Sequence, residues 1–67
     1  MTIRIGVIGA GIMGAEHARL IREEARGATL AAVCDADANR ARAAAGGGKA
    51  FTDPMALIGS DEVDAIV

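Results

Sequence analysis

A glycine-rich turn lies between an apolar stretch and a helical pattern near the start of the chain. Residues 9–14 read GAGIMG, they follow the apolar run at 3–8, and apolar or small residues recur after them at spacings of three and four. A strand, a G-x-G-x-x-G turn and a helix in this order are typical of a dinucleotide-binding βαβ unit. The turn lets the backbone approach a pyrophosphate, and the helix directs its unpaired N–H groups and positive dipole end at the phosphates.

The rest of the 67-residue chain alternates between strand and helix patterns. Asp37 and Asp53 are each placed to cap a helix, and Gly27 and the triple glycine at 46–48 are placed to end one. The predicted strands are 3–8, 28–34, 49–51 and 63–67, and the predicted helices are 11–26, 38–45 and 54–58. This order predicts an α/β fold, the N-terminal part of a Rossmann-type doubly wound parallel sheet (β-α-β-α-β-α-β). The sequence stops within the fourth strand, so we expect residues 1–67 to be a partial NAD-binding Rossmann domain of a longer protein.

An acidic residue follows the second predicted strand. Asp35 lies 21 positions after Gly14, where its carboxylate can accept hydrogen bonds from the adenosine ribose. Its charge would repel a 2′-phosphate, so we expect NAD to be preferred over NADP. A turn or capping role is the alternative for Asp35, although Asp37 suits capping better. Arg40 lies about one helical turn into the next predicted helix. There it would line the adenine side of the site and tolerate a 2′-phosphate; the alternative is that it is simply a solvated helix residue.

These considerations define the candidate site. The residues predicted to bind the cofactor are Gly9, Ala10, Gly11, Ile12, Met13, Gly14, Asp35 and Arg40. A structural turn without a ligand is the alternative reading of the glycines. His17, the only histidine, is predicted to be structural, and Cys34 to act as a small buried hydrophobe. We assign no catalytic residue and no metal ligand in this chain.

Composition narrows the possible partners. Seven basic and nine acidic residues give a net charge of −2, and Phe51 is the only aromatic residue, so neither a basic patch nor a stacking surface for nucleic acid is expected. No stretch approaches the roughly 18 apolar residues of a membrane span. A single cysteine and a start without an export signal favour a cytoplasmic protein.

Three segments resemble the glucose–fructose oxidoreductase/inositol dehydrogenase/rhizopine-catabolism (Gfo/Idh/MocA) family. They are IRIGVIGAGIMG at 3–14 with EHA at 16–18, VCDAD at 33–37 with Arg40 after it, and FTDP at 51–54 leading to DEVDAIV at 61–67. The third segment is the most discriminating, and the nearest likeness within the family is to bacterial inositol 2-dehydrogenases. The resemblance covers the length of the chain.

The resemblance implies an oxidoreductase that transfers a hydride between NAD and a secondary alcohol of a polyol or sugar, and that is a homo-oligomer when full length. The family's catalytic lysine and its later aspartate and histidine lie beyond these 67 residues. Two alternatives remain: an NADP-linked 3-hydroxyacid dehydrogenase, which also favours glycine-isoleucine-methionine-glycine at this turn, and a non-catalytic nucleotide-binding fragment.

Overall fold

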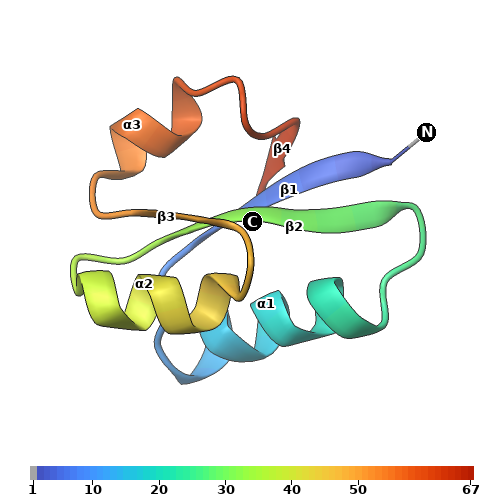
Figure 1. Cartoon of the computed structure of the whole chain (residues 1–67), viewed down its shortest axis with the longest axis horizontal. Coiled ribbons are helices and arrows are strands. Elements are labelled where there is room, and N and C mark those ends of the chain that lie inside the picture. Colours follow the sequence, from blue (N-terminus) through green and yellow to red (C-terminus); the bar gives the residue numbers. More distant parts are fainter. Residues whose placement is uncertain (1) are drawn as a thin grey trace.

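Four parallel strands form the centre of the molecule (Figure 1). The computed structural model describes residues 2–67. The strands are β1 (Ile3–Ile8), β2 (Ala28–Cys34), β3 (Lys49–Phe51) and β4 (Ala65–Ile66), and the helices are α1 (Ile12–Glu23), α2 (Ala38–Ala45) and α3 (Pro54–Ile58). In the sheet the order is β3-β2-β1-β4, so the chain winds outward from β1 to β3 and then returns to the other side of β1. This reversal places a topological switch point at the carboxyl end of β1, where open α/β sheets bind ligands.

The helices cover both faces of the sheet. Figure 1 shows α1 and α2 together on one face and α3 on the other. On the first face, Val7 and Val33 of the sheet pack with small helix residues such as Ala18 and Ala45, all of them buried. On the second face, Leu57 of α3 is fully buried in a separate cluster. The small side chains bring α1 and α2 close to the strands, as expected for a doubly wound sheet.

The predicted fold class and most element boundaries are confirmed. The bounds of β1, β2, α2, β3 and α3 agree with the sequence prediction, and both predicted caps are present. The Asp37 side chain accepts hydrogen bonds from the backbone N–H groups of Asn39 and Arg40, and Asp53 accepts one from Met55. Local sequence signals are therefore sufficient to fix these elements.

The bounds of two elements were predicted wrongly. The first helix ends at Glu23 rather than near Arg26, because the N–H groups of Glu24 and Ala25 both bond to the carbonyl of Leu20 and the chain leaves the helix there. Ala25 is consequently exposed, and Gly27, at φ +73°, serves the turn into β2 instead of ending the helix as predicted.

The fourth strand is the second element whose bounds were predicted wrongly. It spans only Ala65–Ile66 of the predicted 63–67. Its approach is set by Arg4, whose backbone N–H and guanidinium both bond to the Asp64 carboxylate, at 2.8 Å and 2.9 Å. The Asp64 N–H in turn donates to the carbonyl of Arg4 at 2.7 Å. Because the Arg4 N–H donates to the Asp64 side chain rather than to a backbone carbonyl, the ladder begins only at Ala65.

Candidate cofactor-binding site

The glycine turn joins the carboxyl end of β1 to the start of α1. Gly9 has φ +93°, a conformation that side chains rarely tolerate, and its N–H donates to the carbonyl of Cys34 at 2.7 Å. Gly11 is the N-cap of α1 and supplies no side-chain cap. Because the first N–H groups of a helix have no partner within it, the turn presents uncapped donors at the positive end of the helix dipole.

The glycines of the turn differ in the space around them. A Cβ atom added to Gly11 would meet nothing within 4 Å, so the backbone there is open to a ligand. A Cβ atom on Gly14 would lie 1.6 Å from the carbonyl oxygen of Gly9. Gly14 therefore allows the helix to pack against the turn itself, whereas Gly11 leaves the approach to the helix N-terminus free. Both observations fit a dinucleotide pyrophosphate.

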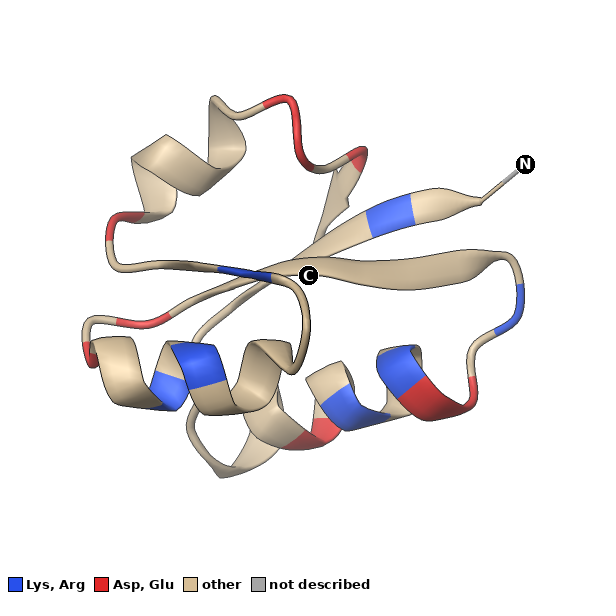
Figure 2. Cartoon of the chain, in the orientation of Figure 1, with Lys and Arg blue, Asp and Glu red and all other residues tan. Residues whose placement is uncertain are grey.

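Asp35 lies beside this turn at the end of β2. One carboxylate oxygen, Oδ2, accepts the Ala10 N–H at 2.8 Å, and the other, Oδ1, accepts the Asp37 N–H at 2.8 Å. The guanidinium of Arg40 lies 3.4 Å from Oδ1. The N–H groups of Asp37 and Ala10, with a smaller contribution from Arg40, hold the pKa of Asp35 below its ordinary value, so the group is a carboxylate at neutral pH. Figure 2 marks the two acidic residues where β2 leads into α2.

The carboxylate of Asp35 is therefore engaged rather than free, and its bond to the Asp37 N–H is a turn contact of the kind predicted from the sequence as the alternative role for Asp35. A carboxylate offers about four acceptor positions. Two backbone N–H groups use two of them and Arg40 forms an ion pair at 3.4 Å, so capacity remains for a ribose hydroxyl. The Asp-x-Asp spacing is a local signal for the bond to Asp37. Nothing in the sequence signals the bond to Ala10, which is 25 positions away.

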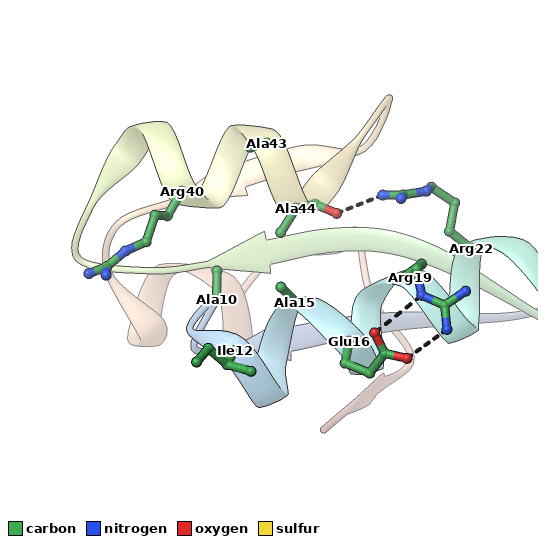
Figure 3. A pocket seen from close by; sticks show the side chains of 9 residues that line it. All are labelled: Ala10, Ile12, Ala15, Glu16, Arg19, Arg22, Arg40, Ala43 and Ala44. Carbon is green, nitrogen blue, oxygen red and sulfur yellow. Dashed lines mark hydrogen bonds and ion pairs between the residues drawn. The ribbon is translucent and has the colours of Figure 1, made fainter.

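A groove of about 390 Å³ runs between α1 and α2, with one end at the glycine turn (Figure 3). Arg40 lies at that end with 60 % of its side chain exposed. At the far end Arg22 crosses from α1 and donates to the carbonyl of Ala44 at 3.0 Å. The groove is lined by Ala10, Ile12, Ala15, Glu16, Arg19, Arg22, Arg40, Ala43 and Ala44. The sides of the two helices form the groove. Ala10 of the glycine turn lines it, whereas Asp35 does not.

The remaining candidates are placed as follows. Ile12 and Met13, in the first turn of α1, expose 92 % and 69 % of their surface. His17 is exposed on α1, away from the core. Cys34 is buried, and burial raises the pKa of its thiol, so it packs as a hydrophobe.

Among residues 2–67, no helix has the length and apolar character needed to cross a bilayer.

Comparison with known proteins identifies the family. Residues 3–67 match the family model described as "Oxidoreductase family, NAD-binding Rossmann fold". Inositol 2-dehydrogenase 2 of Saccharopolyspora erythraea is 50 % identical over 70 residues, which cover 100 % of this chain and 21 % of that protein. Inositol 2-dehydrogenase 2 of Paenarthrobacter aurescens is 52 % identical over 68 residues, which cover 100 % of this chain and 20 % of that protein. The chain thus spans about one fifth of the length of these curated relatives.

Solved structures agree with the sequence relatives. Myo-inositol dehydrogenase of Lactobacillus casei, in complex with NAD(H) and myo-inositol, superposes with a TM-score of 0.89 at 33 % identity, covering 98 % of this chain and 21 % of that one. Scyllo-inositol dehydrogenase of the same organism, with bound NAD(H) and scyllo-inositol, gives 0.87 at 28 %, covering 98 % and 20 %. These matches favour the predicted family over the 3-hydroxyacid dehydrogenases. The chain belongs to the Gfo/Idh/MocA oxidoreductase family and forms an NAD-binding Rossmann segment of it.

Proposed function

We propose that the full-length protein is an NAD-dependent oxidoreductase that acts on a secondary alcohol of a polyol, an inositol in the first instance, and that this chain supplies the cofactor cradle. NAD provides the hydride acceptor when it is bound. The observation that carries the proposal is the combination of an open, uncapped helix N-terminus at Gly11 with a carboxylate, Asp35, one strand away. The inositol dehydrogenases that match the whole chain support the substrate class.

Each part of the cradle has a separate task. The backbone N–H groups from Gly11 to Met13 bind the pyrophosphate, which needs an approach that no side chain blocks. Asp35 accepts a hydrogen bond from a hydroxyl of the adenosine ribose and repels a 2′-phosphate, so NAD is preferred over NADP. Arg40, exposed beside it, lines the adenine side. No residue of this chain is assigned to the transfer of the hydride or a proton. We further propose that the full-length protein is a cytoplasmic homo-oligomer.

Calorimetric titration of the full-length protein with NAD and with NADP tests the cofactor assignment. We expect the affinity for NAD to be the higher one. An equal or higher affinity for NADP would contradict the role of Asp35. Oxidation of myo-inositol, followed by NADH absorbance, tests the substrate class, and reaction only with alcohols that are not polyols would overturn it.

The role of Arg40 is tested by Arg40→Gln against a matched control, Arg42→Gln. Both variants remove one positive charge from α2, but the Arg42 side chain bonds to Asn39 on its own helix rather than to Asp35. Removing Arg40 leaves the repulsion between Asp35 and a 2′-phosphate uncompensated, so the ratio of NADP to NAD dissociation constants should rise. The same ratio in both variants and the wild type would show that Arg40 is only a solvated helix residue.

A further inference from the structure

One residue, Asp35, connects three separate segments at the carboxyl edge of the sheet. Through its side chain Asp35 bonds to the N–H of Ala10 in the glycine turn and to the N–H of Asp37 ahead of α2, each at 2.8 Å. Its own N–H donates to the carbonyl of Phe51 at the end of β3, at 3.0 Å. The turn after β1, the entry to α2 and the end of β3 therefore meet at this residue.

The bond to Ala10 is a strong restraint on the turn. Ala10 is buried, with 6 % of its surface exposed, and the Asp35 side chain exposes only 10 %. A buried N–H that loses its acceptor keeps its desolvation cost, so the turn would have to move to rehydrate it. The bond is also charge-assisted, which makes it stronger than one between neutral groups. The neighbouring Gly9, which donates to the carbonyl of Cys34, is fixed to the same strand.

We propose that Asp35 is a positioning residue for the phosphate-binding turn, in addition to any contact that it makes with ribose. By holding the Ala10 N–H it keeps the turn in the shape that exposes the first N–H groups of α1. This inference rests on the proposed function, because it concerns the affinity of the same cradle. It predicts that losing Asp35 weakens binding even of nucleotides that have no ribose hydroxyl to offer.

A pair of nucleotides separates the two roles. ADP carries the 2′ and 3′ hydroxyls, and 2′,3′-dideoxy-ADP lacks both while it keeps the diphosphate and the adenine. If Asp35 only accepts ribose hydroxyls, its loss should weaken ADP and leave dideoxy-ADP unchanged. If Asp35 also positions the turn, its loss should weaken both nucleotides.

The experiment is calorimetric titration of the full-length protein with each nucleotide, for the wild type, Asp35→Ala and Asp64→Ala. Asp64 is the matched control, since it too is a carboxylate that accepts a backbone N–H at 2.8 Å and an arginine, but it lies beside the start of β1 rather than the end. We expect Asp35→Ala to lower the affinity for dideoxy-ADP by roughly tenfold or more, the equivalent of losing one buried hydrogen bond. Asp64→Ala should leave both affinities within twofold.

A second variant and a second measurement cover poor folding of Asp35→Ala. Asp35→Ser keeps a hydroxyl that can accept the Asp37 N–H two positions further on, but this side chain is too short to reach the Ala10 N–H. Hydrogen exchange of the peptide spanning residues 8–14, without nucleotide, should be faster in Asp35→Ser than in the wild type and Asp64→Ala. Rates equal to those of the wild type would overturn the inference.

The outcomes remain separable from those of the proposed function. A wild type that binds neither ADP nor dideoxy-ADP would refute the cradle itself. A wild type that binds both, with dideoxy-ADP affinity unchanged by the loss of Asp35, would refute only the positioning role.

Discussion

Replacing Gly14 with alanine should destabilise the fold, although alanine is the better helix former. The new Cβ would lie 1.6 Å from the carbonyl oxygen of Gly9, far inside the 3.0 Å below which such contacts essentially never fall, so the helix and the turn must move apart. The turn cannot yield easily, because Gly9 also donates to the carbonyl of Cys34. Alanine gains about 1 kcal/mol of helix propensity, whereas overpacking costs about 1–3 kcal/mol, and a clash with a backbone oxygen, which cannot rotate away, lies at the upper end of that range.

We therefore expect Gly14→Ala to lower the free energy of unfolding by about 2 kcal/mol, measured by urea denaturation of the full-length protein. NAD affinity should fall as well, since the N–H groups that face the pyrophosphate move with the helix. Gly11→Ala is the matched substitution. Its Cβ meets nothing within 4 Å and its φ of −69° suits any residue, so stability should stay within about 0.5 kcal/mol of the wild type.

The two variants should thus separate stability from binding. Gly11→Ala should lose NAD affinity while the fold is unchanged, because the methyl group lies where the pyrophosphate must approach. The reasoning would be refuted if Gly14→Ala were as stable as the wild type, or if Gly11→Ala bound NAD with wild-type affinity.

Three further expectations follow from the packing and charges. Arg4 holds the pKa of Asp64 below its ordinary value of 3.8, so this pair stabilises the fold above about pH 4, and the stabilisation is lost as the pH falls through the lowered pKa. Asp64→Asn should flatten that loss in acid denaturation curves, and an unchanged curve would contradict the role of the pair. Leu57→Ala, at a fully buried site, should lower the free energy of unfolding by about 2–5 kcal/mol in urea, and a loss below about 1 kcal/mol would show that α3 is not anchored there. Cys34 should resist alkylation in the native protein and react on unfolding, since it is buried and its thiol pKa is raised; rapid native-state labelling would contradict this.

The sequence was informative where structure is determined locally. Aspartate caps, a proline after Asp53 and glycines between periodic segments predict the bounds of α2 and α3, because each signal acts within one helical turn. The errors in the bounds of α1 and β4 arise from hydrogen bonds that the local sequence pattern does not show. The end of α1 depends on two N–H groups sharing the carbonyl of Leu20, and the start of β4 depends on a contact between Arg4 and Asp64, 60 positions apart.

The candidate site shows the same division. The spacing of the glycines and of Asp35 predicted a cofactor cradle, because dinucleotide binding imposes that spacing on the backbone. The spacing could not predict that Asp35 would already be bonded to Ala10, since this contact depends on how closely the turn after β1 approaches the end of β2. A site read from a motif therefore identifies which residues meet, but not which of their acceptors remain available.

A crystal structure of the full-length protein with NAD would test the central claim most directly. We predict that the pyrophosphate accepts hydrogen bonds from the backbone N–H groups between Gly11 and Met13, with an adenosine ribose hydroxyl donating to Asp35 while the Ala10 N–H stays bonded to the same carboxylate. NAD bound away from the glycine turn, or with its ribose out of reach of Asp35, would contradict the account.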